Sequence, residues 1–168
     1  MANGPKSHQN LMDAFAGESQ ANRKYLAFAK QADQEGFTQV ARLFRAAAEA
    51  ETVHAHSHLR TAGGVGDTKK NLLEAIAGET HEFKNMYPQM IADAELEGAD
   101  AARRSFTFAN AVEKIHASLY QRALDSLGAT TEEFDYYICP VCGFTAERQA
   151  PERCVVCGAQ GSVFYKAA

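Results

Sequence analysis

The segments Ala50-Glu51-Thr52-Val53-His54 and Val112-Glu113-Lys114-Ile115-His116 decide the fold. In each segment, Glu and His are three positions apart, which places both side chains on one face of a helix, one turn apart. A carboxylate and an imidazole in this position can bind the same metal ion. The sequence therefore predicts two helices that each present such a ligand pair.

The region around these pairs contains four segments with helical periodicity, rich in Ala, Glu, Gln, Arg and Leu. They cover residues 8–35, 38–61, 69–97 and 100–127. Each segment is followed by a glycine where a helix can end, at Gly36, Gly63, Gly98 and Gly128. Ser7 and Thr68 are the expected caps of the first and third helices. The pattern predicts an all-α fold, a four-helix bundle.

The helical region is also a duplicated hairpin. Most matched positions of the two halves are 62 residues apart, as Tyr25 and Tyr87 are. Glu18 and its counterpart Glu79 are 61 apart, so the third helix holds one extra residue between Glu79 and Tyr87. One extra residue in a continuous helix is commonly absorbed as a π-bulge. We therefore expect a π-bulge there, and a kink from the nearby Pro88.

Each helix carries a carboxylate in the middle of its apolar stripe, namely Glu18, Glu51, Glu79 and Glu113. Four converging carboxylates repel each other or take up protons unless cations compensate their charge. Two divalent ions neutralise the four, and His54 and His116 add one nitrogen ligand for each ion. This ligand set suits iron or manganese. The alternative is a set of solvated glutamates on Glu-rich helices, but the duplicated pattern favours the metal site.

All four cysteines lie near the end of the chain, as Cys139-Pro-Val-Cys142 and Cys154-Val-Val-Cys157. Two such motifs form a tetrahedral four-sulfur metal site, and about thirty residues cannot build an adequate core without one. The spacing suits iron and zinc equally, so a structural zinc ribbon is the alternative to a redox-active iron site. We expect two domains, a helical one over residues 1–135 and a four-cysteine one over residues 136–168.

Composition narrows the class of protein further. A hydrophobic content of 46% suffices for a packed core, while a net charge of −4 with dispersed basic residues gives no indication of nucleic-acid binding. No apolar run is long enough to span a membrane, and residues 1–10 are polar with no signal region. With every cysteine assigned to a metal site, a reducing compartment fits best. These features predict a cytoplasmic protein.

These residues together resemble the rubrerythrin family across nearly the whole chain. The shared features are Gly17-Glu18 with Tyr25, Glu51-x-x-His54, Gly78-Glu79-x-x-Glu82 with Tyr87, Glu113-x-x-His116 and the two Cys-x-x-Cys motifs. The resemblance implies a ferritin-like bundle with two iron ions, bridged by oxo and carboxylate groups, followed by a rubredoxin-like module with one iron. Val155 departs from the proline that is usual in rubredoxin motifs.

Glu82 is a fifth carboxylate, and its counterpart in the first half is Ala21. In rubrerythrins the matching Glu binds one iron in the oxidised state and is replaced by the His of the first Glu-x-x-His when the centre is reduced. The resemblance thus implies that Glu82 alternates with His54. It also implies that Tyr25 and Tyr87 donate hydrogen bonds to ligating carboxylates, the alternative being that both tyrosines only fill the core.

By resemblance, the expected function is a peroxidase that reduces hydrogen peroxide to water. Electrons would come singly from the four-cysteine iron, which an external reductase or rubredoxin would reduce. Glu51 and Glu113 are the expected bridging ligands, with Glu18 and Glu79 terminal and His116 on one ion. The alternatives are a ferritin-like ferroxidase and a non-catalytic scaffold with zinc in the four-cysteine site.

The link between the second and third helices is short. In a ferritin-like bundle these helices run parallel, so residues 62–69 must travel most of the bundle length. They reach at most about 28 Å, against about 27 Å along the axis plus a lateral step of roughly 8–10 Å between helices. We therefore hypothesise a homodimer in which residues 1–62 of one chain pair with residues 69–127 of the other.

Overall fold

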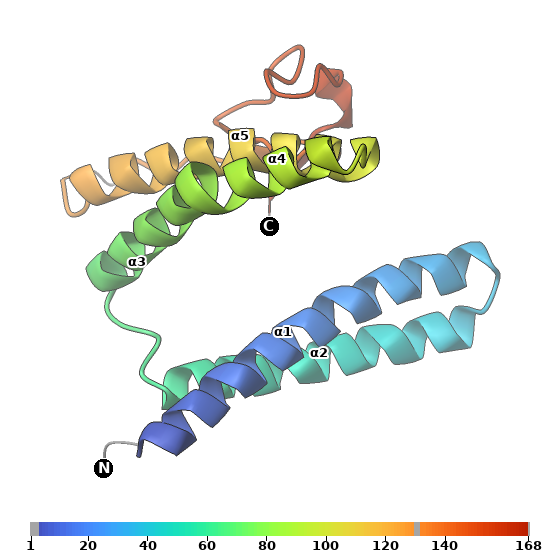
Figure 1. The fold of residues 1–168 in the computed structure, drawn as a ribbon, viewed down its shortest axis with the longest axis vertical. Helices are drawn as coiled ribbons and strands as arrows, with labels where there is room; N and C mark the ends of the chain where they lie inside the picture. The colour runs from blue at the N-terminus through green and yellow to red at the C-terminus, as the bar shows by residue number, and fades with distance from the viewer. Residues whose placement is uncertain (1–3, 130–131, 168) are drawn as a thin grey trace. The chain divides into compact units, whose positions relative to one another are not determined.

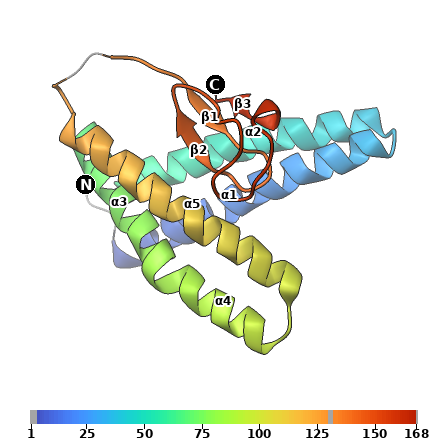
Figure 2. The ribbon, with the colours of Figure 1, turned by 90° about the horizontal axis from the view of Figure 1, so that it is seen from above.

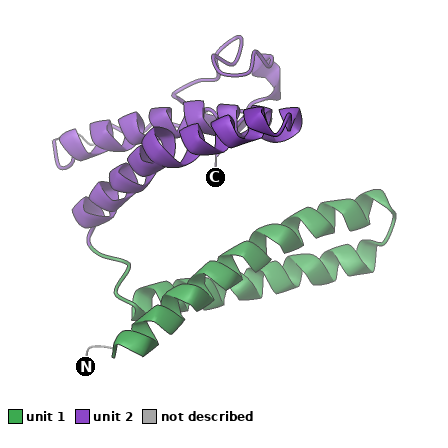
Figure 3. Cartoon of the chain, viewed as in Figure 1, with its two compact units in different colours: residues 1–66 green, residues 67–168 purple. Residues whose placement is uncertain are grey.

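The computed structural model describes residues 4–129 and 132–167. The first three residues of the polar start, and residues 130–131 before the predicted domain boundary, lie outside the described part of the chain. The chain forms two compact units, residues 1–66 and residues 67–168, shown in different colours in Figure 3. Each unit contains one copy of the duplicated hairpin.

The first unit is a hairpin of two long helices, α1 (Pro5–Gln34) and α2 (Thr38–Thr61) (Figure 1). Small side chains let the two helices pack closely, because the buried residues are all alanines: Ala29, Ala32, Ala41, Ala48 and Ala55. The turn uses Gly36 at a φ of 84°, a left-handed conformation that favours glycine. The expectation that Ser7 caps α1 is wrong, since the helix begins earlier, at Pro5, a residue suited to a first turn.

The helices of the second unit form a bent hairpin. Its first arm consists of α3 (Thr68–His81), the π-helix η1 (Glu82–Met86) and α4 (Tyr87–Leu96); α5 (Asp100–Asp125) is the second arm (Figure 2). The expected π-bulge is confirmed, within the stretch between Glu79 and Tyr87. Without it, an extra residue would rotate Tyr87 by about 100° relative to Tyr25 in the first hairpin, at 3.6 residues per turn. The π-turn therefore lets both hairpins present their tyrosine on the same face.

The start of α3 corrects a second expectation. Thr68 was the predicted cap, but the capping residue is Asp67, whose Oδ1 accepts a hydrogen bond from the backbone N–H of Lys70 at 2.8 Å. Asp67 has extended backbone geometry, with φ −68° and ψ 167°, as N-cap residues do. The negative charge of the carboxylate also interacts favourably with the positive end of the helix dipole.

The C-terminal part of the second unit is a small antiparallel sheet of β1 (Tyr136–Ile138), β2 (Thr145–Glu147) and β3 (Tyr165–Lys166), in the order β2-β1-β3. A short 3₁₀ turn, η2 (Gly161–Val163), precedes β3. The buried side chains of this module are few, namely Cys139, Ala146 and Cys154, and two of these three are cysteines. A core this small agrees with a module that depends on a metal ion.

Among the described residues, no helix is both long and apolar enough to cross a membrane.

The cap of α3 leads to a direct test. Replacing Asp67 with Ala removes the hydrogen bond to Lys70 and should lower the free energy of unfolding by about 1 kcal/mol. Thr68→Ala should change it by less than about 0.5 kcal/mol, and Asp67→Asn should retain most of the cap. Denaturant unfolding at one fixed protein concentration measures all three. A larger loss in Thr68→Ala than in Asp67→Ala would contradict the assigned cap.

Candidate metal centres

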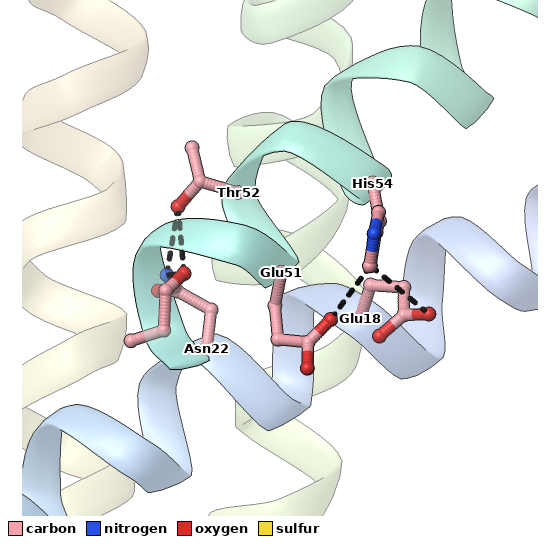
Figure 4. Close-up of polar contacts among 6 residues, drawn as sticks. Glu18, Asn22, Glu51, Thr52 and His54 are labelled. Atoms are coloured by element: carbon pink, nitrogen blue, oxygen red, sulfur yellow. Dashed lines mark hydrogen bonds and ion pairs between the residues drawn. The ribbon is translucent and has the colours of Figure 1, made fainter. Parts of the chain in front are cut away.

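The first hairpin gathers Glu18 of α1 with Glu51 and His54 of α2 (Figure 4). One donor atom from each of these residues lies within 4.8 Å of the other two. Nδ1 of His54 is 2.9 Å from Oε2 of Glu51 and 4.0 Å from Oε1 of Glu18. Donor atoms on one ion, each about 2.0–2.2 Å from it, are at most about 4.4 Å apart. A small contraction of the cluster would therefore suffice to hold an ion.

Asn22 fixes the two helices beside this cluster. Its side-chain amide donates to the carbonyl of Ala48 at 2.7 Å. It also donates to the hydroxyl of Thr52 at 2.9 Å (Figure 4). Thr52 directly follows Glu51 in α2, and Asn22 lies one turn from Glu18 in α1. The clamp thus sets the register of the two ligand-bearing helices. This role is not visible in the sequence, because the partners are 26 and 30 residues away from Asn22.

The second hairpin repeats the arrangement with Glu79 of α3 and with Glu113 and His116 of α5. Nδ1 of His116 is 2.8 Å from Oε2 of Glu113 and 3.7 Å from Oε1 of Glu79. The same atom of each histidine thus faces the carboxylates in both clusters. We call the two clusters half-sites, because each offers only two carboxylates and one imidazole.

The carboxylates of the second half-site are too crowded to be fully ionised on their own. Burial, the hydrogen bond with Glu113 and the charge of that neighbour raise the pKa of Glu79 to about 7. Burial likewise raises the pKa of Glu113, and the charge of Glu82 raises it further. A divalent cation would replace the proton that Glu79 and Glu113 hold between them. The donor chemistry therefore fits a metal ion.

Glu82 begins the π-helix and is not part of the three-residue half-site. It is nevertheless close enough to act on Glu79 and Glu113 through its charge. The placement of a fifth carboxylate at the edge of the half-site agrees with the prediction that Glu82 is an additional ligand. The ligand role itself stays a prediction.

The two predicted tyrosines differ in their surroundings. Tyr25 lies in an aromatic cluster, with ring centroids 6.4 Å from Phe28 and 6.1 Å from Phe44. Burial and the charges of Glu113, Glu82 and Glu79 raise the pKa of Tyr87. Tyr87 therefore lies within electrostatic reach of the second half-site, whereas Tyr25 contacts the aromatic rings of Phe28 and Phe44.

Tyr120 is a further residue near the second half-site, one that sequence analysis did not assign to it. Burial and then the charges of Glu79 and Glu113 raise the pKa of Tyr120. Its position was the available signal, because Tyr120 is four residues after His116 and thus on the same helix face. Tyr87 and Tyr120 both keep their phenolic protons at neutral pH and can donate hydrogen bonds.

The four cysteines converge as predicted. Sγ of Cys139 is 3.6 Å from Sγ of Cys157, and Sγ of Cys142 is 3.5 Å from Sγ of Cys154. A tetrahedral ion with metal–sulfur distances of about 2.3 Å requires sulfurs about 3.8 Å apart. Burial raises the pKa of Cys154, but backbone N–H groups of Cys157 and Val156 outweigh it and, with neighbouring thiols, lower this pKa to about 7. Cys154 thus favours thiolate, the form that binds metal, whereas burial raises the pKa of Cys142 and Cys157.

The module packs against α5 through polar contacts that begin at the second half-site. Nε2 of His116 is 2.9 Å from the hydroxyl of Thr145 in β2. Arg122, further along α5, forms an ion pair of 2.7 Å with Glu147 at the end of β2. The module of four cysteines therefore directly contacts a residue of the half-site.

The fold and the sites define a class of protein: helical metalloproteins with a duplicated carboxylate–histidine motif and a C-terminal four-cysteine module. Residues 9–124 match the family model Rubrerythrin, and residues 137–165 match the model of the rubrerythrin rubredoxin-like domain. The chain belongs to the rubrerythrin family.

Curated relatives and solved structures agree. Rubrerythrin-2 of Clostridium acetobutylicum is 38% identical over 92% of both chains. Nigerythrin of Nitratidesulfovibrio vulgaris is 34% identical over 89% of this chain and 80% of its own. A solved structure of nigerythrin in a partially reduced state has a TM-score of 0.59 and 31% sequence identity, covering 99% of this chain and 89% of that chain. The expected class, a ferritin-like all-α protein with a rubredoxin-like module, is confirmed. The position of the domain boundary stays a prediction.

The raised pKa of Glu79 predicts how the metal-free protein responds to pH. Between about pH 4.5 and 7 the folded chain holds a proton that the unfolded chain releases, so stability should fall as pH rises through this window. The loss should be about 1–2 kcal/mol, because partial exposure reduces the effect. Glu79→Gln, which cannot ionise, should be more stable than the wild type at pH 8 and similar at pH 4.5.

Thermal unfolding of the chelator-treated protein across this pH range measures the effect. Glu74→Gln, at an exposed position of the same helix, serves as the matched control. An identical pH dependence in the wild type and in Glu79→Gln would contradict the assignment.

Proposed function

We propose that this protein is a non-haem di-iron peroxidase that reduces hydrogen peroxide to water, with electrons relayed through iron in the four-cysteine site. The observation that carries the proposal is the presence of two half-sites with the same donor set, together with a four-sulfur site, in one chain of the rubrerythrin family. Membership of this family supports an oxidoreductase. The specific oxidant and electron donor are part of the proposal.

The ligand count supports a joint centre. One half-site gives an ion only three protein ligands, of which two are carboxylates. Two half-sites facing each other provide four carboxylates and two imidazoles, which balance the charge of two divalent ions. By resemblance to the family, we propose Glu51 and Glu113 as the bridging ligands and Glu18 and Glu79 as terminal ones.

Iron is the metal that the family relationship supports for these sites. One solved relative is nigerythrin in a fully reduced, all-ferrous state, 31% identical to this chain with a TM-score of 0.59. We propose two iron ions in the helical centre and one in the four-cysteine site, with zinc as the alternative in the latter. When bound, a ferrous pair supplies the two electrons that, with two protons, convert one hydrogen peroxide into two water molecules.

The protein's own residues would orient peroxide and retain protons. Tyr87 and Tyr120 keep their phenolic protons because burial and nearby carboxylates raise their pKa. They are thus suited to donate hydrogen bonds to ligating carboxylates or to peroxide oxygen. For Tyr25 we propose the matching role beside the first half-site, although its aromatic neighbours Phe28 and Phe44 also give it a packing role.

The two histidines differ in a way that supports the proposed exchange of ligands between Glu82 and His54. Nε2 of His116 contacts Thr145, which holds the ring in place. Within the described part of the chain, His54 has contacts only through Nδ1, to Glu51 and Glu18. His54 is therefore the imidazole that can move on and off an ion, while Glu82 lies beside the other half-site to take its place.

An external reductase or a rubredoxin is the proposed electron donor, and the cytoplasm is the proposed location. The alternative function, a ferritin-like ferroxidase, uses the same carboxylate centre but gives the four-cysteine site no role. Direct contact between the module and a half-site residue favours the peroxidase.

Peroxide titration tests the proposal. The iron-loaded protein, reduced under anaerobic conditions, should be oxidised by hydrogen peroxide with the appearance of ferric-thiolate and di-ferric absorption. Glu82→Ala should slow turnover by about 10–100-fold, whereas Glu74→Ala should not. The peroxidase proposal fails if neither chromophore responds to peroxide. Normal turnover in Glu82→Ala would refute the ligand exchange and leave the centre itself intact.

The short link between the hairpins supports a homodimer with exchanged segments. Helix α2 ends at Thr61 and α3 begins at Thr68, so the link reaches at most about 25 Å. In a ferritin-like bundle, the distances from Glu51 to the end of α2 and from the start of α3 to Glu79 add up to about 31 Å along the axis. We therefore propose that each centre combines the first hairpin of one chain with the second hairpin of its partner.

Mixed dimers distinguish this arrangement from an unswapped one. Glu51→Ala damages the first half-site and Glu113→Ala damages the second, so either variant alone should lack di-iron centres. In a swapped mixed dimer, one centre carries both substitutions and the other carries neither. Differently tagged, co-expressed variants should thus recover about half of the wild-type di-iron absorption. No recovery in the purified mixed dimer would show that each chain builds its own centre.

A further inference from the structure

His116 has both ring nitrogens engaged, by different parts of the second unit. Nδ1 faces the half-site, 2.8 Å from Oε2 of Glu113. Nε2 faces the four-cysteine module, 2.9 Å from Oγ1 of Thr145. One ring therefore connects the two candidate metal sites.

The hydroxyl of Thr145 determines which nitrogen carries a proton when metal is bound. This hydroxyl donates to the carbonyl of Gly143 at 3.3 Å, which uses its only proton. Its oxygen is then free to accept a hydrogen bond from Nε2–H of His116. With the proton held on Nε2, the lone pair of Nδ1 points at the carboxylates of the half-site. That is the tautomer in which Nδ1 can bind an ion.

Contacts of the residues before and after Thr145 hold this residue in position. Thr145 and Glu147 are two residues apart in β2, so they share one face of the strand, and Gly143 lies just before the strand with a φ of 83°. A Cβ on Gly143 would lie 4.0 Å from Val112, one turn before His116 in α5, and Glu147 pairs with Arg122 at 2.7 Å. Contacts on both sides of Thr145 thus restrict its movement along α5.

Apolar surroundings also strengthen the hydrogen bond between His116 and Thr145. Both residues line a cavity of about 320 Å³ whose other walls are mostly apolar: Leu72, Leu119, Tyr120, Ala123 and Tyr136. A hydrogen bond next to apolar groups is stronger than one in open water.

Covalent and hydrogen bonds also connect Thr145 to the cysteines. Gly143 directly follows Cys142, and its N–H donates to the carbonyl of Cys139 at 2.9 Å. The chain from Cys142 through the Gly143 carbonyl and the Thr145 hydroxyl to His116 therefore consists only of covalent and hydrogen bonds.

We propose that Thr145 is a positioning residue that fixes His116 with Nδ1 toward the helical centre and provides the hydrogen-bonded route for electrons from the four-cysteine site of the same chain. The route rests on the proposed function. Each transfer oxidises one ferrous ion at the cysteines to ferric and reduces one ferric ion of the helical centre to ferrous. Two transfers restore the diferrous pair, and an external reductant re-reduces the cysteine site after each.

Three variants of the full-length, iron-loaded protein test the proposal. Thr145→Val keeps the shape but removes the hydroxyl, and Thr145→Ser restores it. Thr107→Val is the matched control, because Thr107 on α5 bonds only the carbonyl of Arg103 among the described residues. Proton NMR of the reduced protein follows solvent exchange of the paramagnetically shifted imidazole N–H signals. Stopped-flow absorption after one equivalent of peroxide follows oxidation of the cysteine-bound iron.

Thr145→Val should speed exchange of one imidazole N–H by about tenfold, the effect of losing one hydrogen bond of ordinary strength. It should slow oxidation of the cysteine-bound iron by a similar factor, while Thr145→Ser and Thr107→Val behave like the wild type. Unchanged N–H exchange in Thr145→Val would overturn the positioning role. Altered exchange with an unchanged electron-transfer rate would overturn the route. The NMR measurement needs no peroxide, so it decides the role of Thr145 even if the peroxidase proposal fails.

Discussion

Repulsion among carboxylates on the inner faces of two helical hairpins is the constraint on which the rest of the structure depends. Burial raises the pKa of both Glu79 and Glu113, and the hydrogen bond with Glu113 and its charge help to raise that of Glu79 to about 7. A core built only for stability would have apolar residues at these positions. Retaining carboxylates there makes sense when cations are bound, and the histidine beside each pair completes a set of donors for them.

The two hairpins repeat the same ligands but differ in how firmly they hold them. The first has Asn22, which fixes the helices, and a histidine, His54, with contacts only to carboxylates among the described residues. The second has the π-helix with Glu82, and a histidine held from behind by Thr145. The two copies thus share one set of donors and differ in the contacts that surround it.

Much of this architecture could be predicted from the spacing of residues. The spacing between matched residues of the two hairpins changes from 61 to 62. This change was sufficient to locate the π-helix, because the third helix must absorb one extra residue between the last pair with the first spacing and the first pair with the second. The Glu-x-x-His pairs and the cysteine spacing likewise predicted which side chains converge. These features are local, or repeat within the chain, and so are visible in a sequence.

Features that depend on tertiary contacts were not visible. Thr145 is 29 residues from His116, and nothing in the order of residues brings the two together. Asn22 lies one turn from Glu18 in the sequence, but its clamp depends on the packing of α1 against α2. The cap of α3 was misplaced by one residue because Asp67 and Thr68 are both good capping residues, and only the backbone conformation distinguishes them.

The central claim is that two half-sites form one paired iron centre, separate from the iron bound by the cysteines. Mössbauer spectroscopy of the protein reconstituted with ⁵⁷Fe tests it most directly. Our account predicts two iron sites with oxygen and nitrogen ligands that are magnetically coupled when oxidised, and a third, uncoupled site with the signature of four thiolates. Oxidised helical iron without magnetic coupling would contradict the account, since it would show that each half-site binds its ion alone.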